Sequence, residues 1–216
     1  MSPVLRLAAP PERIAVAHHS GPGLRGILWV QGCSLLCTRV CLNPHLLDPT
    51  KGFAVDADAA ARSVLRILAQ YAEAEGVTIL GGEPFDQAAA LAAMLEPIRA
   101  AGYSTMVYSG HTHEDLLRRD DAAALLAVSD ILVDGPFIEA LYDPALIWRG
   151  SSNQRVIPLT ARYTAEGIEA AQIAQGRSQF VARGPSGDLL VTGLQSRAAG
   201  AEARHAALGG TRVVDV

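Results

Sequence analysis

The segment GCSLLCTRVC, residues 32–41, contains every cysteine of the 216-residue chain, at Cys33, Cys37 and Cys41. Cysteines placed at random would rarely gather in one short segment, so the clustering predicts a site that uses three thiolates. In a reducing compartment such a cluster usually binds a metal or takes part in catalysis, because disulfides do not persist there. The chemistry of this segment therefore decides how the rest of the chain is interpreted.

The composition is typical of a globular protein with one substantial core. Half of the residues are hydrophobic, 19% are charged, and the formal net charge is -4. This charge provides no electrostatic basis for binding nucleic acid or an anionic membrane. Pro10 and Pro11 interrupt the N-terminal segment before a signal-peptide core can form, and no apolar run reaches transmembrane length. We therefore expect a cytoplasmic protein.

Strand and helix patterns alternate along the chain. Short apolar runs predict strands at residues 13–17, 27–31, 77–80, 105–108 and 131–134. Alanine- and leucine-rich runs predict helices at residues 56–75, 87–100 and 114–128. This order favours an α/β fold whose parallel strands are joined by right-handed helical crossovers, in a barrel or an open sheet.

Four candidate ligand-binding segments each follow a predicted strand directly: the cysteine segment and residues 81–84, 109–110 and 134–135. Ligands collect at the carboxyl ends of parallel strands, so we expect all four segments on one rim of the sheet. Gly81 and Gly82 would let the backbone approach a ligand closely, and Glu83 would offer a carboxylate before Pro84 stiffens the exit. An ordinary strand-to-helix turn would be favoured if this segment stood alone, but the cysteine segment precedes it at the end of an earlier strand.

Several motifs together resemble the radical S-adenosylmethionine (radical SAM) family, in particular its anaerobic ribonucleotide reductase activating proteins, which are glycyl-radical activases. The resemblance runs from about residue 14 to residue 157 and keeps the motifs in order. They are GPGLRGILWVQGC at residues 21–33, CLNPH at 41–45, ILGGEPF at 79–85, VYSGHT at 107–112, ILVDGPF at 131–137 and WRGSSNQR at 148–155.

The resemblance implies a partial radical SAM (β/α) barrel and a specific set of ligands. Cys33, Cys37 and Cys41 would bind three irons of a 4Fe-4S cluster and leave the fourth iron open for S-adenosylmethionine. Gly81, Gly82, Glu83 and Pro84 would receive the methionine amino group of that cofactor. Ser109 and Asp134 match positions that contact its carboxylate or ribose.

The resemblance also implies an oxidoreductase activity. Reductive cleavage of S-adenosylmethionine would yield methionine and a 5′-deoxyadenosyl radical, which abstracts hydrogen from a protein substrate. The substrate would be a glycyl-radical enzyme such as anaerobic ribonucleotide reductase, and the electron donor a protein such as flavodoxin or ferredoxin.

One departure from the family pattern leaves other functions open. The family spacing is C-x3-C-x2-C, whereas this chain has C-x3-C-x3-C, with the extra residue in 38–40. Loops tolerate such insertions, so a cluster remains compatible with the spacing. The chain could instead act on a different peptide or small substrate, or be a non-catalytic iron–sulfur or zinc protein. In the zinc interpretation His18, His19 or His45 would be the fourth ligand.

Two further interpretations of the cysteines concern structure alone. A spacing of four and four would place them along one face of a helix, where cysteine packs as a small hydrophobic residue. A disulfide would leave one thiol over and conflicts with the absence of a secretion signal. Elsewhere, His111 and His113 begin the third helix, where we expect a capping role beside Thr112. Arg149 and Arg155 are expected to bind a carboxylate or to form structural salt bridges.

The C-terminal part lies beyond the resemblance. We expect residues 1–159 to form the radical SAM domain and residues 160–216 a small extension that docks on it. The extension would contain a helix at residues 165–175 and a hairpin of strands at 178–183 and 188–192 around the turn 184–187. Residues 198–210 would form a loose helix or a tail.

Overall fold

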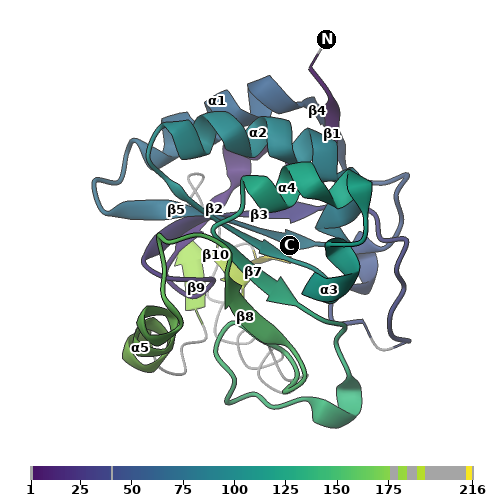
Figure 1. Ribbon diagram of the computed structural model, residues 1–216. Helices are drawn as coiled ribbons and strands as arrows, with labels where there is room; N and C mark the ends of the chain where they lie inside the picture. The colour runs from purple at the N-terminus through teal and green to yellow at the C-terminus, as the bar shows by residue number, and fades with distance from the viewer. Residues whose placement is uncertain (1, 40, 176–179, 184–188, 193–212, 216) are drawn as a thin grey trace.

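The computed structural model describes residues 2–39, 41–175, 180–183, 189–192 and 213–215 (Figure 1). Eight strands form one sheet in the order β4-β1-β3-β5-β6-β7-β8, and β2 pairs with β3 beside this path. Their bounds are β1 Val4–Leu7, β2 Ala15–Ala17, β3 Leu24–Val30, β4 Phe53–Asp56, β5 Ala74–Gly81, β6 Ser104–Tyr108, β7 Ile131–Asp134 and β8 Arg155–Pro158. The helices are α1 Ala57–Leu68, α2 Ala88–Ala100, α3 His113–Leu116, α4 Ala123–Ala127 and α5 Ala165–Gln175.

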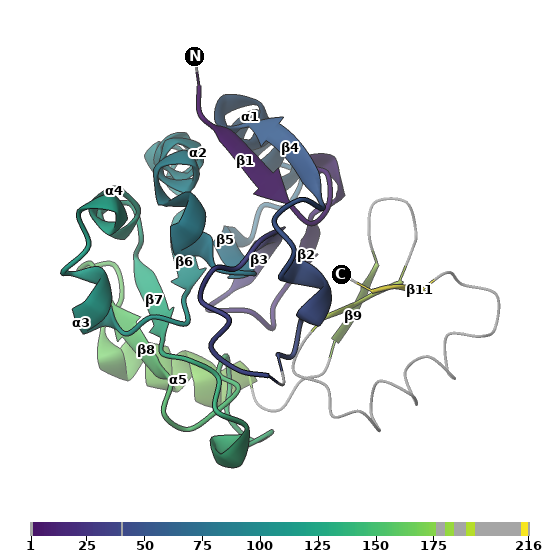
Figure 2. The same cartoon turned by 90° about the vertical axis from the view of Figure 1, so that its right-hand side faces the viewer.

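The centre of the sheet is parallel, and its two sides are antiparallel. Strands β3, β5, β6 and β7 pair in parallel, while β1, β2 and β4 pair antiparallel on one side and β8 on the other. This arrangement confirms the α/β class with a mainly parallel central sheet. Figure 2 shows the sheet turned by 90°, with β1 and β4 at one side and β7 and β8 at the other. The closure of the sheet into a partial barrel remains a prediction.

Helices cover the two faces of the sheet unequally, with α1, α2 and α4 on one face and α5 on the other (Figure 1). Successive side chains along each strand point to opposite faces of the sheet. Val107 and Leu132 belong to the main core beneath α1 and α2. Met106 and Ile131 belong to a second cluster that includes Ile168 of α5. We call this second face of the sheet the inner face.

Two predicted helices differ from the structure. The helix expected at residues 56–75 begins after Asp56, whose carboxylate accepts a hydrogen bond from the Ala59 N–H at 3.0 Å, but it ends at Leu68. Strand β5 then begins at Ala74, and within it Gly76 packs so closely on β6 that an added Cβ would lie 2.0 Å from the Ser104 carbonyl oxygen. The helix expected at 114–128 is divided into α3 and α4 by a 3₁₀ turn at Asp120–Ala122.

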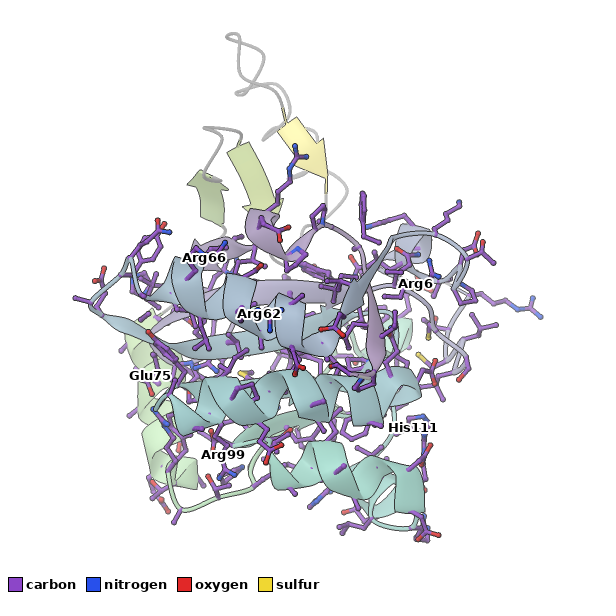
Figure 3. The ribbon with its side chains drawn as sticks, turned by 90° about the horizontal axis from the view of Figure 1, so that it is seen from above. Arg6, Arg62, Arg66, Glu75, Arg99 and His111 are labelled. Atoms are coloured by element: carbon purple, nitrogen blue, oxygen red, sulfur yellow. The ribbon has the colours of Figure 1, made fainter. Side chains whose placement is uncertain are left out.

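The amino-terminal ends of the parallel strands are held together by a fully buried arginine, Arg25. Its guanidinium donates to the Thr78 hydroxyl at 2.8 Å, the Ser104 hydroxyl at 2.7 Å and the Val77 carbonyl at 2.6 Å. Burial lowers the pKa of this guanidinium. Glu75 lies at the same end of the sheet, opposite the end where His111 lies (Figure 3). Arg25 therefore joins β3, β5 and β6 far from the predicted ligand site.

The described part of the C-terminal segment agrees with the sequence-based expectation. Helix α5 has the predicted bounds, and the backbone of β9 (Phe180–Arg183) pairs antiparallel with β10 (Leu189–Thr192) as the hairpin prediction requires. A third strand, β11 (Val213–Asp215), pairs in parallel with β10, and β9 lies near β2. The predicted turn at 184–187 and the segment 198–210 lie outside the described residues. The domain boundary at residue 159 remains a prediction.

Within the described residues, no helix is long and apolar enough to cross a membrane.

Candidate active site

The four predicted ligand-binding segments meet at one rim of the sheet, as expected from the parallel order of β3, β5, β6 and β7. Backbone hydrogen bonds join the first two segments, since the Gly82 N–H donates to the Val30 carbonyl and the Glu83 N–H to the Gly32 carbonyl, both at 2.9 Å. The other two segments are joined by the Gly135 N–H, which donates to the His111 carbonyl at 2.8 Å. The predicted meeting of these segments is therefore confirmed.

Glu83 joins the segments that follow β5 and β6. Its side chain is buried, with 1% exposed, and both carboxylate oxygens accept hydrogen bonds. Oε1 accepts from the Phe85 N–H at 3.0 Å and from the Ser109 hydroxyl at 2.9 Å, and Oε2 accepts from the Gly110 N–H at 2.9 Å. Burial raises the pKa of the Glu83 carboxyl, and these three donors oppose the rise. Ser109 is thus placed by a direct contact with the predicted ligand edge.

The glycines of this edge have a packing role that the sequence did not predict. A Cβ added to Gly82 would lie 1.9 Å from the Gly32 carbonyl oxygen. Gly81 has a φ of +125°, and its added Cβ would lie 2.3 Å from the Val30 carbonyl oxygen. The close approach is therefore between this edge and the backbone that leads into the cysteine segment. The predicted contact with a methionine amino group remains a prediction, as does the role of Pro84, which begins a 3₁₀ turn.

The cysteine segment is an irregular loop in its described residues, so the helical interpretation of the cysteine spacing was wrong. Leu36 has a φ of +42°, which is uncommon for a residue with a Cβ. Burial raises the pKa of the Cys33 thiol, and the backbone N–H groups of Leu36 and Leu35 oppose this. Burial also raises the pKa of the Cys37 thiol, where a backbone N–H of Phe137 opposes it. Backbone N–H groups thus lie beside the sulfurs of Cys33 and Cys37 and favour their thiolate forms.

The three cysteines are free thiols, so the structure contains no disulfide among them. The Cys37 Sγ lies 3.7 Å from the Cβ position of Gly110, beside the Glu83 carboxylate. The Cys41 Sγ accepts a hydrogen bond from the Asn43 N–H at 3.4 Å. Across the described part of the chain, no three His, Cys, Asp or Glu side chains converge closely enough to hold a metal ion. Neutral thiols do not attract one another, and metal binding is what deprotonates them and draws them together.

Two anchors hold the cysteine loop, and the sequence analysis identified neither. Asp86 accepts from the Ser34 N–H at 2.6 Å and from the Ser34 hydroxyl at 2.7 Å. Gln31 donates through Nε2 to the carbonyls of His45 at 3.0 Å and Asp48 at 2.9 Å, which closes the loop at its far end. No local pattern marks these residues, because each contact depends on segments that meet only in the fold.

Asp134, the last predicted contact with the cofactor, is buried on the rim and already has a charged partner. Arg155 donates through Nε to Asp134 Oδ1 at 3.0 Å and pairs with Oδ2 through Nη2, and the His113 N–H donates to Oδ2 at 2.7 Å. The same arginine forms a bidentate pair with Glu114 at 2.9 and 2.6 Å. Arg155 therefore forms the predicted structural salt bridge, whereas Arg149 donates to the Gln154 carbonyl. Thr112, and neither histidine, is the N-cap of α3, because its hydroxyl accepts from the Asp115 N–H at 3.2 Å and His113 is already the first residue of the helix.

Comparison with known proteins identifies the class to which this rim belongs. Residues 19–157 match the family described as "4Fe-4S single cluster domain". The chain is 32% identical over 143 residues to the anaerobic ribonucleoside-triphosphate reductase-activating protein of Salmonella typhi, covering 63% of this chain and 90% of the relative. The Escherichia coli K12 protein of the same name is 31% identical over 143 residues and is likewise covered to 90%.

Two further proteins are more distantly similar. The pyruvate formate-lyase-activating enzyme of Clostridium pasteurianum is 29% identical over 120 residues, which cover 53% of this chain and 50% of that enzyme. The crystal structure of QueE from Escherichia coli matches 51% of this chain and 54% of its own at 19% identity, but its TM-score of 0.32 is too low to show a shared fold.

The chain belongs to the 4Fe-4S single cluster domain family and is a radical SAM oxidoreductase. Its cofactors are a 4Fe-4S cluster and S-adenosylmethionine. The residues at the rim fit such a cluster, because three thiols of one loop are soft ligands and each sulfur has a backbone N–H group beside it.

Proposed function

We propose that this chain is an activating enzyme that cleaves S-adenosylmethionine reductively and then takes a hydrogen atom from a glycine of a large protein substrate. Anaerobic ribonucleotide reductase is the first substrate to test, because the relatives with 90% coverage are named as its activating proteins. The observation that carries the proposal is the hydrogen-bonded contact between Glu83 and the segment at Ser109 and Gly110, beside the cysteine loop. This rim combines three thiols that can bind iron with a polar edge, formed by Glu83, Ser109 and Gly110, that can bind S-adenosylmethionine.

Cys33, Cys37 and Cys41 would hold the cluster in this proposal. When bound, the cluster supplies one electron that breaks a carbon–sulfur bond of S-adenosylmethionine, giving methionine and a 5′-deoxyadenosyl radical. The backbone donors at Cys33 and Cys37 stabilise negative charge on the thiolates that bind iron. The three donors at Glu83 use three of the roughly four acceptor sites of a carboxylate, which leaves one for a ligand ammonium group.

The second step of the proposed reaction is the transfer of a hydrogen atom. A hydrogen atom moves from the glycine Cα to the 5′ carbon, which forms 5′-deoxyadenosine and leaves the unpaired electron on the glycine. The radical must be kept from other C–H and S–H donors, and the buried Glu83 and Ser109 close this point of the rim to solvent and solutes.

The test of the chemistry is anaerobic reconstitution with iron and sulfide, followed by dithionite reduction with S-adenosylmethionine. We expect release of 5′-deoxyadenosine, and its loss to background in Cys37→Ala. Gln70→Ala is the control, because Gln70 is exposed in the turn between α1 and β5, at the opposite end of β5 from the rim, and its side chain donates to the Arg66 carbonyl. A colourless, zinc-loaded protein that releases none would contradict the proposal.

A second candidate keeps this chemistry but changes the substrate to a different peptide. The C-x3-C-x3-C spacing and the segment beyond residue 157 favour it, since the family match ends there. The two are separated by electron paramagnetic resonance after incubation with a purified anaerobic reductase. A glycyl radical signal on the reductase supports activation, and its absence despite 5′-deoxyadenosine release supports the second candidate. The physiological electron donor, flavodoxin or ferredoxin, can be tested in place of dithionite.

A further inference from the structure

Trp148 has an unusual backbone conformation for a large buried residue. Its φ is +62°, in the left-handed region that favours glycine, and its side chain is 5% exposed. A residue held in this region costs free energy and persists only where the surrounding structure fixes it, and such residues are concentrated at functional sites. Trp148 belongs to the WRGSSNQR segment, on the approach to β8. The contacts that fix it therefore show what it is used for.

The carbonyl of Trp148 is hydrogen-bonded to a residue next to the rim. The Tyr108 hydroxyl donates to it at 2.8 Å, and Tyr108 is the last residue of β6. Ser109 and Gly110, two of the three donors to Glu83, come directly after it. A shift of the Trp148 backbone would therefore be transmitted to the rim within one or two residues.

The indole and its neighbour are held from the opposite side by α5. The Trp148 Nε1–H donates to Gln175 Oε1, and Gln172 donates to the Ile147 carbonyl at 2.9 Å. Gln175 also donates to the Gly21 carbonyl at 3.4 Å, which ties the end of α5 to the segment before β3. The indole packs with Met106, Ile131 and Val133 on the inner face of the sheet.

Helix α5 lies beyond residues 19–157, the part of the chain that matches the family. Helix α5, outside the part that matches the family, thus supports Trp148, which lies inside that part. Figure 1 shows α5 on the inner face, across the sheet from α1, α2 and α4. Together, α5 and the indole cover the inner face of β6 and β7 behind Tyr108.

We propose that Trp148 is a positioning residue for the protein substrate and that α5, through Gln172 and Gln175, holds it in place. The inference rests on the proposed function, since it assigns a wall of the same site. The peptide segment that donates the hydrogen atom stops against the region that the indole fills, so its depth in the site depends on α5. Through α5, the C-terminal extension is therefore part of the substrate site.

The test uses the intact chain with the substitution Trp29→Phe, because Trp29 and Trp148 are the two tryptophans of the sequence. In this background the fluorescence of Trp148 reports its burial directly, with or without cofactors. Gln175→Ala is expected to shift the emission to longer wavelength and to increase acrylamide quenching. Gln175→Glu keeps an acceptor for the indole N–H and should restore both, while Gln70→Ala should change neither.

The second readout separates binding from chemistry. Gln175→Ala should raise the KM for the protein substrate about tenfold, the value of one lost hydrogen bond, and lower the radical transferred per 5′-deoxyadenosine released. Unchanged fluorescence, quenching and KM in Gln175→Ala would overturn the proposal. A wild type that releases no 5′-deoxyadenosine would instead overturn the proposed function and the substrate role with it. In that case the fluorescence would still decide whether α5 holds Trp148.

Discussion

The Glu83 carboxylate and the Gly110 backbone N–H are joined by a buried hydrogen bond of 2.9 Å that connects the ends of β5 and β6. The same carboxylate accepts from Ser109, so two consecutive residues of one segment are positioned by one side chain of another. Because Gly110 also faces Leu35 and Cys37, this contact relates the polar edge to the cysteine loop. It is the central link of the proposed site.

The first prediction concerns Glu83→Gln. Glutamine keeps the size of the side chain but replaces one acceptor oxygen by a donor, which would face the N–H of Gly110 or the donors at Oε1. A buried donor left without an acceptor costs about 1–3 kcal/mol, so we expect a loss of that order in the free energy of unfolding and weaker binding of S-adenosylmethionine. Urea denaturation and calorimetry measure the two effects. Glu73→Gln, at an exposed position, is the control, and equal behaviour of the two variants would contradict the prediction.

The second prediction is that Gly82→Ala destabilises the fold by about 3 kcal/mol, because the new Cβ would overlap a backbone carbonyl that has little freedom to move. That oxygen, of Gly32, lies 1.9 Å from the Cβ position. Gly167→Ala is the matched control, since Gly167 lies within α5 and its Cβ position is 3.3 Å from the Thr164 hydroxyl alone. Alanine favours a helix over glycine, so the control should be neutral or slightly stabilising. A Gly82→Ala protein as stable as the wild type would show that this crowding is relieved.

The third prediction concerns the buried Arg25. Lysine has a single donor atom and cannot reach Thr78, Ser104 and the Val77 carbonyl together, so acceptors would remain unpaired in the core. Breaking a buried charged network costs about 3 kcal/mol or more, which should appear in the urea midpoint of Arg25→Lys. Arg62→Lys on the surface of α1 is the control (Figure 3). Similar midpoints for both variants would contradict the proposed role of Arg25.

The fourth prediction is an acid-dependent loss of stability caused by His19. Burial, and then the neighbouring His18, lower the pKa of His19 to about 4 from an ordinary value of 6.5. The folded state therefore favours the neutral ring, and its stability is complete above pH 6.5 and falls as the pH drops through that value towards 4. A shift of this size corresponds to about 3 kcal/mol.

The measurement is the free energy of unfolding of the cofactor-free protein between pH 7 and pH 4. His19→Gln should lose most of the pH dependence, because glutamine does not titrate. His18→Gln, at the exposed neighbouring position, should keep it. Parallel pH curves for wild type and His19→Gln would contradict the assignment.

The fifth prediction concerns the extra residue of the cysteine loop. Arg39 is exposed in an irregular loop, so its deletion would restore the family spacing without breaking a strand. We expect the reconstituted variant to bind the same iron and sulfide per chain as the wild type. Deletion of Ser34 is the control, since it removes both contacts with Asp86 and should abolish the cluster. Loss of iron in the Arg39 deletion would show that this protein requires its own spacing.

Much of the central fold could be predicted from local patterns. Strand β7 and helix α5 have the bounds expected from the sequence, because a buried apolar run and a helical spacing are signals carried by adjacent residues. Strands β1 and β4 were not predicted. They pair residues such as Leu7 and Phe53, and such distant pairing leaves no mark in either segment alone.

The sequence by itself determined the donor set and the order of the strand-end motifs, since these depend on residue type and on spacing along the chain. From that order follows the meeting of the cysteine loop with Glu83, Ser109 and Asp134 at one rim, because parallel strands end on the same side. The tertiary structure alone decided the partners: Arg155 for Asp134, the Gly32 backbone for Gly82, and α5 for Trp148. Each of these pairs forms only when packing brings distant segments together and removes water from the polar atoms that must then bind one another.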